Sequence, residues 1–453
     1  MLNIINSNIK NYIVLFFFVS LLTAQRVVGY YPYWVQNTLL PQNIDLATFT
    51  HINHAFAWPD ANGEIIAPNN SFFDVVTSSY IHDLDRKFIL SLGGGGQGHG
   101  FATSTSTYDI RAVFIENIID KLITYGYDGI DIDWEHPQST EQRNNLTQFI
   151  QELDSTFNAF DPELLITMAV PISNWSGQWY DFNSLKLHVD YFNAMTYDIH
   201  GGWSAHAGHN SPLYQSPQGD PDGSVQTGIN YLISSGIPQE KINMGIPFWG
   251  KQYNTSTING NFSGTVVDLY YNEITPLIGN GWVYEWDNVA KCPYLVKDDQ
   301  TKIITYDNPL SVEYKCNYAK LRNLGGVMVW ALGYDEIGGD ETLTGAINMH
   351  WLSASNRDSK ILPNDASLAV FPNPFNPGTK IKFELHKAEN IRINIYNIRG
   401  TIIGTVVNGY FKAGIHVMNY YPESNHDNIS SGVYFLELET STKRVTKKIL
   451  YIK

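Results

Sequence analysis

Residues 128–135 read Asp-Gly-Ile-Asp-Ile-Asp-Trp-Glu, a short segment in which acidic and apolar residues alternate. Alternate side chains of a β-strand point to the same face. As a strand, the segment places Asp131, Asp133 and Glu135 on one face and the apolar residues between them on the other. Asp128 falls outside this alternation and is expected to be structural. The segment therefore predicts a strand with one apolar face and one acidic face.

Three carboxylates at this spacing repel one another unless hydrogen bonds and a shared proton separate their pKa values. The outermost, Glu135, can then stay protonated near neutral pH and act as a general acid. A divalent-cation site and a solvated edge strand are the alternatives. The apolar opposite face argues against an edge strand, and no tight histidine cluster accompanies the acids to support a metal site.

The acidic segment is one of eight predicted strands. They lie at residues 27–31, 51–57, 87–92, 129–134, 164–170, 191–197, 242–248 and 326–332. Helical patterns, such as 110–124 and 140–157, separate several of them. Strands that alternate with helices predict a parallel sheet, and eight such units predict a (β/α)8 barrel. Catalytic residues of such barrels lie at the carboxyl ends of the strands, which is where the acids stand.

The composition limits the class of function. The chain has 453 residues and a formal net charge of −15, which opposes nucleic-acid binding because phosphates need a basic surface. Aromatic residues make up 13% of the chain, enough to stack on sugar rings or to fill a large core. The two cysteines, Cys292 and Cys316, cannot form a disulfide scaffold. One disulfide and two free thiols are both consistent with the sequence.

The N-terminal residues 1–24 predict a secretory signal peptide. Lys10 precedes an apolar run from Tyr12 to Leu22, and Ala24 supplies the small residue typical of a cleavage site. The run is about half the length of roughly 20 residues that spans a bilayer, which favours cleavage over a membrane anchor. No stable membrane span is predicted elsewhere.

The acidic segment matches the DxxDxDxE signature of glycoside hydrolase family 18, the chitinase family. Further segments that resemble this family, in the same order, are VGYYP (28–32), HINHAFA (51–57), SLGG (91–94), MTYDIHGGW (195–203), GHNSPLY (208–214) and GVMVW (326–330). The resemblance spans residues 26–352. It implies a (β/α)8 TIM barrel, assigned to residues 25–353, with an inserted small α+β subdomain at 251–305.

The resemblance also implies a role for each matching residue. Glu135 would protonate the glycosidic oxygen, while the N-acetyl group of the substrate supplies the nucleophile. Asp133, supported by Asp131, would hold the acetamide N–H, and Tyr197 would donate its hydroxyl to the acetamide oxygen. The other predicted substrate-binding residues are Asp198, Met195, Trp330, Tyr30, Phe56, Trp34, Trp203 and Gly94. Ordinary packing in the core or on the surface is the alternative role for four of these residues, Tyr30, Phe56, Trp34 and Trp203.

Several residues depart from the family pattern or lack a family role. His136 follows the acid where a tyrosine is common, and can either tune Glu135 or simply pack. Gly95, Trp249 and Lys251 also differ, which weakens predictions about sugar register but removes no catalytic group. No cofactor and no metal is predicted. Four histidines, His99, His200, His206 and His209, are instead expected to form loop hydrogen bonds.

The C-terminal part has a different character. Residues 354–367 form a polar linker, and residues 368–453 contain alternating segments that predict a β-sandwich. This tail resembles the sorting domain of the type IX secretion system, with PNP at 372–374, YNIRG at 396–400 and SGVY at 431–434. The resemblance implies type IX machinery as a partner and a secreted, extracellular or cell-surface location. A carbohydrate-binding module is the alternative, although the tail contains no tryptophan.

Together these features predict a secreted chitinase that hydrolyses β-1,4 bonds between N-acetylglucosamine units with retention. Its binding partner would be chitin or N-acetylglucosamine oligosaccharides. One alternative is a non-catalytic chitin-binding lectin on the same barrel, a class that typically lacks the acid present here as Glu135. Another is an endo-N-acetylglucosaminidase that acts on glycan cores or peptidoglycan.

Overall fold

The computed structural model describes residues 25–96, 98–335, 342–352, 367–371, 373, 375–385, 388–397, 399–412, 414–422, 429–441 and 444–453. The expected signal peptide, most of the expected linker and parts of the expected tail motifs lie outside these residues. The chain divides into two compact units, Met1–Ser353 and Ala354–Lys453. Among the described residues, no helix combines the length and the apolar character that crossing a membrane requires.

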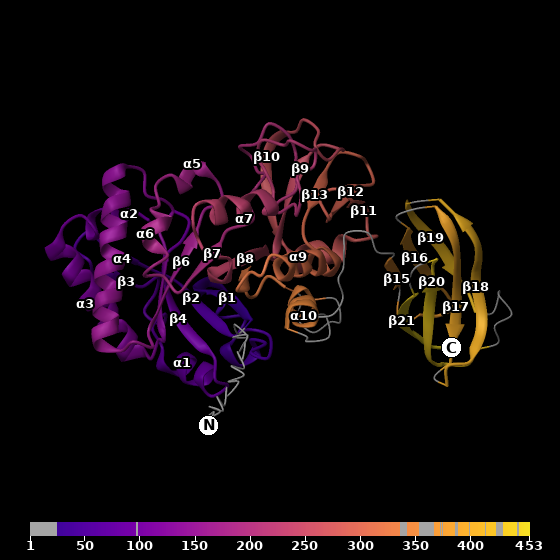
Figure 1. The fold of residues 1–453 in the computed structure, drawn as a ribbon, viewed down its shortest axis with the longest axis horizontal. Helices are drawn as coiled ribbons and strands as arrows, with labels where there is room; N and C mark the ends of the chain where they lie inside the picture. The colour runs from indigo at the N-terminus through magenta and orange to yellow at the C-terminus, as the bar shows by residue number, and fades with distance from the viewer. Residues whose placement is uncertain are drawn as a thin grey trace, which may run out of the picture. The chain divides into compact units, whose positions relative to one another are not determined.

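The first unit is a closed barrel of eight parallel strands, as the sequence predicted (Figure 1). The strands are β1 (Arg26–Pro32), β2 (His51–Pro59), β4 (Lys87–Gly93), β5 (Gly129–Asp133), β6 (Leu165–Val170), β7 (Tyr191–Ala194), β8 (Ile242–Pro247) and β14 (Gly326–Trp330). The barrel closes because β1 pairs in parallel with both β14 and β2. A two-residue strand, β3 (Ile65–Ile66), extends β2 outside the barrel.

Helices cover the outside of the barrel. They are α1 (Val75–His82), α2 (His99–Ser104), α3 (Tyr108–Tyr125), α4 (Thr140–Phe160), α5 (Asn174–Gly177), α6 (Phe182–Leu185), α7 (Val225–Ser234), α9 (Pro309–Leu321) and α10 (Leu343–Ile347). In α4, the Ser139 hydroxyl caps the first turn by accepting from the backbone N–H of Gln142. Its buried side chains, Leu146, Phe149, Ile150, Leu153 and Phe157, recur every three or four residues, so they form one stripe.

The two faces of β5 differ as the alternation predicted. Ile130 and Ile132 are fully buried in the large apolar cluster that also contains side chains of α3 and α4. A smaller apolar cluster of other strands, including Val28, Phe56 and Met328, fills the barrel interior. The acidic face of β5 therefore points into the barrel.

Four of the predicted barrel strands end one to three residues earlier than expected, and the difference is largest in β7. The pattern at 191–197 predicted a strand through Tyr197, but β7 ends at Ala194. The chain turns there, because the Thr196 N–H donates to the carbonyl of Ala194 and the Thr196 hydroxyl donates to the carbonyl of Gly245. Asp198 has a positive φ of 54°, which no regular strand residue adopts. Tyr197 and Asp198 therefore belong to a loop above the barrel.

The segment between β8 and β14 forms an inserted subdomain with its own five-stranded antiparallel sheet (Figure 1). In spatial order the strands are β10 (Ser263–Tyr270), β9 (Trp249–Asn254), β13 (Ile303–Thr305), β12 (Cys292–Lys297) and β11 (Trp282–Asp287), and the helical turn α8 (Tyr271–Ile274) follows β10. Cys292 and Cys316 are both buried free thiols, which resolves the choice that the sequence left open.

The second unit contains two antiparallel sheets that face a shared apolar core, as expected for a β-sandwich. One sheet has the order β15 (Ser367–Phe371), β16 (Thr379–Leu385), β19 (Gly414–Tyr420). The other has the order β18 (Ile402–Phe411), β17 (Glu389–Tyr396), β20 (Gly432–Glu439), β21 (Arg444–Tyr451). Alternate residues of β16, β17 and β20, such as Phe383, Ile393 and Leu436, are buried in that core.

Candidate active site

Asp131 lies at the bottom of the acidic face of β5 and is fully buried. Its Oδ2 accepts hydrogen bonds from the hydroxyls of Tyr30 at 2.8 Å and Ser91 at 2.7 Å. Its Oδ1 accepts from the Thr167 hydroxyl at 2.5 Å and the Asn193 amide at 3.2 Å. Burial raises the pKa of Asp131, and these four hydrogen bonds act in the opposite direction because they favour the charged form.

Asp133 lies one step further along the same face and has a different environment. It is 4% exposed, and its Oδ1 is buried with no hydrogen-bond partner among the described residues. Burial raises the pKa of Asp133 well above its ordinary value, and the charges of Glu135 and Asp131 raise it further. A buried acceptor without a donor is unfavourable, so this oxygen is suited to a donor that a ligand brings.

Glu135 follows the end of β5 and is the most accessible of the three acids, with 27% of its side chain exposed. Burial, and after it the negative charge of Asp198, raise the pKa of Glu135 to about 7. Burial thus raises the pKa of both Asp133 and Glu135, and Glu135 is the one whose side chain is partly exposed to solvent. A carboxylic acid with a pKa near neutrality is the requirement for a general acid.

His136 is positioned to face Glu135. The Tyr180 hydroxyl donates to the carbonyl of Trp134 at 2.7 Å and therefore accepts from Nδ1–H of His136 at 2.9 Å. Burial lowers the pKa of His136 to about 4, so the ring is neutral at physiological pH. The unprotonated Nε2 then lies 3.9 Å from Oε2 of Glu135. His136 therefore packs against Tyr180 beside the acid, and it is not among the causes of the pKa shift of Glu135.

Two glycines bring β4 over the end of β5. Gly93 has a φ of 115°, and a Cβ there would lie 2.0 Å from the carbonyl oxygen of Asp133. Gly94 has a φ of 85°, its N–H donates to that carbonyl at 2.9 Å, and a Cβ would lie 2.5 Å from the ring of Phe56. Gly94 therefore acts through its backbone, by fixing the position of Asp133.

Tyr197, Asp198 and Met195 come from the loop that follows β7. The Tyr197 ring packs edge-on against Trp249 with ring centroids 4.9 Å apart, and its hydroxyl contacts the sulfur of Met328 at 3.8 Å. Burial and the surrounding carboxylates, Asp133 first, raise the pKa of Tyr197 well above its ordinary value, so it remains a hydroxyl donor. Asp198 pairs with Lys251 of β9 at 2.7 Å. Met195 is half-buried, and its backbone N–H donates to the carbonyl of Val170.

The predicted aromatic residues divide into a buried group and an exposed group. Tyr30 is 1% exposed and supports Asp131, so it does not line a cleft. Phe56 is 5% exposed and stacks on the half-buried Trp330 with centroids 5.4 Å apart. Trp34, 42% exposed, packs edge-on against Trp330 at 6.0 Å. Trp203 is 67% exposed.

Sequence reasoning missed several residues of the site. Thr167 and Asn193 bond Asp131 from β6 and β7, and Asp268 shares the Lys251 ammonium with Asp198. Trp175, in α5 on the carboxyl side of β6, has 85% of its surface exposed and offers a further flat face. Inward-facing polar residues on neighbouring predicted strands were the available signal for Thr167 and Asn193.

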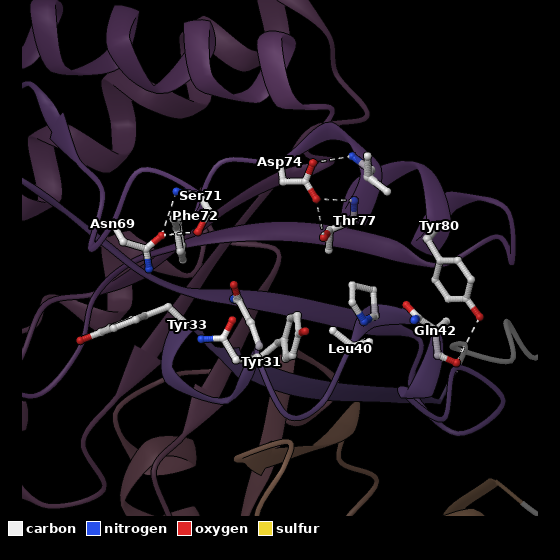
Figure 2. Close-up of a pocket in the computed structure, with 14 residues that line it drawn as sticks. Tyr31, Tyr33, Leu40, Gln42, Asn69, Ser71, Phe72, Asp74, Thr77 and Tyr80 are labelled. Atoms are coloured by element: carbon white, nitrogen blue, oxygen red, sulfur yellow. Dashed lines mark hydrogen bonds between the residues drawn. The ribbon is translucent and has the colours of Figure 1, made fainter.

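A groove of about 290 Å³ lies away from these carboxylates, between the loop after β1 and the start of α1 (Figure 2). Its lining includes Tyr31, Tyr33, Leu40 and Tyr80, and it contains none of the predicted site residues. The carboxylate of Asp74 in its wall is already used, because it accepts from the backbone N–H groups of Val76 and Thr77 as the cap of α1. The groove therefore offers no free catalytic group.

Comparisons with known proteins agree with the architecture. Residues 26–335 match the family of glycosyl hydrolases family 18, and residues 369–453 match the secretion system C-terminal sorting domain. Chitinase A1 of Niallia circulans is 29% identical over 69% of this chain, and the chain spans only 57% of that protein.

Two solved structures are similar over the first unit. The Group IV chitinase of Ostrinia furnacalis has a TM-score of 0.68 and 27% identity, covering 73% of this chain and all of that one. Human YKL-39, described as a pseudo-chitinase with retained chitooligosaccharide binding, has a TM-score of 0.67 and 27% identity over the same shares. With a family match over most of its length and the acidic strand of that family in a closed barrel, the chain belongs to glycosyl hydrolase family 18.

Proposed function

We propose that this protein is a chitinase that hydrolyses β-1,4 bonds between N-acetylglucosamine units by substrate-assisted catalysis with retention. The observation that carries the proposal is the contrast on β5 between Asp133 and Glu135. One presents a buried oxygen without a donor, and the other is a partly exposed acid with a pKa of about 7. An acetamide N–H and a glycosidic oxygen, both from one sugar chain, suit these two groups.

In the first step, Glu135 gives its proton to the glycosidic oxygen while the bond from that oxygen to the anomeric carbon breaks. The carbonyl oxygen of the substrate's acetamide forms the new bond to the anomeric carbon, which gives an oxazolinium ion. Asp133 accepts the acetamide N–H and stabilises its positive charge, and the Tyr197 hydroxyl donates to the acetamide oxygen. Asp131 lies beneath Asp133 and is fixed by four donors, which favour its charged form.

In the second step, water attacks the anomeric carbon from the face that the departing sugar occupied, opposite the acetamide oxygen, and the bond from that oxygen to the anomeric carbon breaks. The Glu135 carboxylate takes the proton of this water, which restores the acid and retains the configuration. Trp330 would form the hydrophobic floor of the sugar site, with Asp198 and Met195 beside it. Trp34, Trp203 and Trp175, which all have exposed faces, would stack on sugars further along the chain.

A chitin-binding lectin on the same barrel is the main alternative, because one similar structure is described as a pseudo-chitinase. The presence of Glu135, with its pKa near 7, favours an enzyme. Product analysis on N-acetylglucosamine hexamers separates the two, since a lectin binds the hexamer and releases no products. Parallel assays on N-glycan cores and peptidoglycan test the other alternative, an endo-N-acetylglucosaminidase.

The mechanism has its own test. Removing the acetyl group from the sugar beside the scissile bond should abolish cleavage there, and a thiazoline that mimics the cyclised intermediate should inhibit strongly. Asp133→Asn should weaken turnover and thiazoline affinity together, because one carboxylate serves both. Efficient cleavage after a glucosamine unit, or a sugar ester trapped on a carboxylate, would overturn the mechanism while leaving the family assignment intact.

We also propose that the protein is exported. Residues 1–24 would be the signal peptide, and the C-terminal unit would be the sorting signal for type IX secretion. The match of residues 369–453 to the sorting domain supports the second part. Export would bring the enzyme to chitin, which is insoluble and cannot enter a cell.

A further inference from the structure

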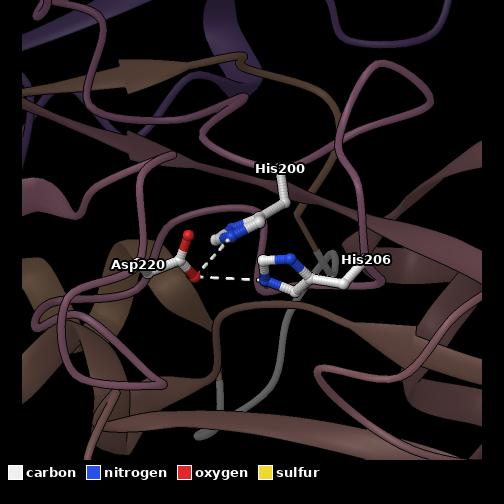
Figure 3. A group of neighbouring side chains, drawn as sticks. All are labelled: His200, His206 and Asp220. Carbon is white, nitrogen blue, oxygen red and sulfur yellow. Dashed lines mark hydrogen bonds and ion pairs between the residues drawn. The ribbon is translucent and has the colours of Figure 1, made fainter.

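Three side chains of the loop between β7 and α7 meet at one point (Figure 3). Nε2 of His200 lies 3.0 Å from Oδ2 of Asp220, and Nε2 of His206 lies 3.1 Å from the same oxygen. The side chains of His200 and Asp220 are fully buried, and that of His206 is 18% exposed. We call these three residues the loop cluster. None of them has a role in the catalytic proposal above.

The hydrogen bonds around His200 show that its Nε2 faces the carboxylate of Asp220. Its Nδ1 lies 2.9 Å from the carbonyl oxygen of His209, which can only accept, so Nδ1 carries the proton of the neutral ring. Nε2 then has a lone pair that faces a carboxylate oxygen at hydrogen-bond distance. A metal cation bound between the two atoms would satisfy both of them.

The orientation of Asp220 favours the cation. Its Oδ1 accepts from the backbone N–H of Asp222 at 3.0 Å, which turns Oδ2 alone toward both imidazoles. The side chain of Asp222 adds a second carboxylate, with Oδ2 3.8 Å from Nε2 of His200. The bond from Nδ1 of His200 to a backbone carbonyl is also the outer contact that metal-binding histidines usually make.

We propose that the loop cluster binds one Zn²⁺ ion, through Nε2 of His200, Nε2 of His206 and Oδ2 of Asp220. Zinc takes histidine nitrogen and carboxylate oxygen ligands in a tetrahedron with bonds of about 2.0–2.1 Å, so its ligand atoms lie roughly 3.3 Å apart. The observed separations of 3.0 and 3.1 Å need to open by only a few tenths of an ångström. Asp222 or water completes the fourth position. The two negative carboxylates balance the charge of the ion.

This zinc would be structural and would hold the loop beside the candidate active site. His200 and His206 lie on either side of Trp203, whose ring packs over Gly201 and lies 5.5 Å from the Lys251 ammonium. His200 is also two positions from Asp198, which pairs with the same lysine. An ion bound at both ends of this short segment would restrict its motion, and with it the motion of the exposed Trp203 ring.

The test is stoichiometric metal binding by the full-length protein. After dialysis against a chelator, Zn²⁺ is titrated into wild type, His206→Gln, Asp220→Asn and the control His188→Gln, and the bound metal is measured by elemental analysis. His188 is a matched control because it forms a histidine–aspartate pair with Asp154 at 2.7 Å, apart from the loop cluster. His206→Gln is the main variant. The ring of His206 is partly exposed, so its replacement should disturb folding less than Asp220→Asn, which changes a fully buried side chain.

Wild type and His188→Gln should each bind one equivalent of Zn²⁺ and show a rise in Tm with it. The two cluster variants should lose both the bound equivalent and the Tm rise. Co²⁺ in place of Zn²⁺ should give the intense visible absorption of a tetrahedral site in wild type only. A wild type that binds no zinc overturns the proposal. Zinc retained by both cluster variants overturns it too, because the ion then binds elsewhere.

Discussion

Asp131 and Asp133 stand two positions apart on the same face of β5, yet their carboxylates have opposite surroundings. Asp131 accepts hydrogen bonds from four side chains, whereas Oδ1 of Asp133 is buried without a partner among the described residues. A saturated carboxylate is fixed in place, and an unsaturated one is available to a ligand. The hydrogen bonds thus fix Asp131 in position beneath Asp133, and Oδ1 of Asp133 is left available to accept a hydrogen bond from a ligand.

Glu135→Gln should remove the proton donor while preserving the shape of the side chain. We expect turnover of N-acetylglucosamine hexamers to fall by about 10²–10⁴-fold or more, since this is the usual contribution of a general acid. Chitin binding, measured by co-sedimentation, should be retained. Wild-type turnover in this variant would show that another group is the acid.

The activity should decline at alkaline pH, because the first step needs protonated Glu135, whose pKa is about 7. Above this pH, kcat/KM should fall about tenfold per pH unit. Asp198→Asn removes a negative charge that raises the pKa of Glu135, so it should move this alkaline limb to lower pH.

Asp268→Asn is the control for the pH profile, because Asp268 also pairs with Lys251 but is not among the causes of the shift at Glu135. An alkaline limb that stays in place in Asp198→Asn would contradict the electrostatic explanation.

The raised pKa of Glu135 should also lower the stability of the fold at neutral pH. Its ordinary value is 4.5 and its folded value is about 7, so between these the folded state binds more protons than the unfolded state. Stability therefore falls as pH rises through this window, by up to about 3 kcal/mol, and is constant above it.

Glu135→Gln cannot ionise, so its Tm relative to wild type should be higher at pH 8 than at pH 4. Glu116→Gln, on the exposed surface of α3, should show no such difference between the two pH values. An equal effect of Glu135→Gln on Tm at pH 4 and pH 8 would mean that the folded protein does not raise the pKa of Glu135.

Lys315→Met should strongly destabilise the barrel unit. The Lys315 ammonium lies 2.7 Å from both oxygens of Asp307 and 2.7 Å from the Ser211 hydroxyl, with the ion pair fully buried. Removing one partner leaves a buried charge, which costs about 3–5 kcal/mol. Adding Asp307→Leu should recover part of this loss.

Urea unfolding followed by tryptophan fluorescence measures this effect in the barrel alone, because all 11 tryptophans lie in the first unit. The control Lys297→Met breaks an exposed ion pair of the same 2.7 Å length with Asp299, and should destabilise the fold far less, because water screens an exposed pair. Equal losses in the two variants would mean that burial does not set the strength of the pair.

Deleting the chain from about Asn364 onward should leave an active barrel in the periplasm of a bacterium with type IX secretion. Hydrolysis of soluble oligomers by the purified truncated protein should be unchanged, because the two units have separate apolar cores. Fusion of residues 369–453 to a reporter with a signal peptide should direct it out of the cell. Loss of catalysis on truncation would show instead that the tail is part of the enzyme.

Much of the fold was predictable because it depends on local pattern. Alternation at 128–135 and 380–385 identified strands whose apolar faces are buried in the two cores. The end of β7 was not predictable, because Thr196 turns the chain by bonding Gly245, which is 49 positions away. A contact of this kind between distant segments leaves no mark on the local pattern.

The acids of the site were predictable for the same reason, since all three lie in one alternating segment, residues 131–135. Their environment was not. Tyr30 was expected to line the cleft, but its hydroxyl is directed to Asp131, and Thr167 and Asn193 do the same from other strands. The meeting of His200, His206 and Asp220 depends on the path of a long loop, which sequence spacing alone does not define.

The four donors to Asp131 also determine the stage of folding at which its carboxylate becomes fixed. They come from β1, β4, β6 and β7, and two of them, Tyr30 and Asn193, are 163 positions apart and also bond each other. Asp131 and its donors span positions 30 to 193, so a chain still being synthesised or threaded through a membrane has no fixed carboxylate at position 131 until this whole stretch has folded. The proposed catalysis would therefore require β1, β4, β5, β6 and β7 to be in place, and a chain folded over a shorter stretch would be inert toward any sugar inside its own cell.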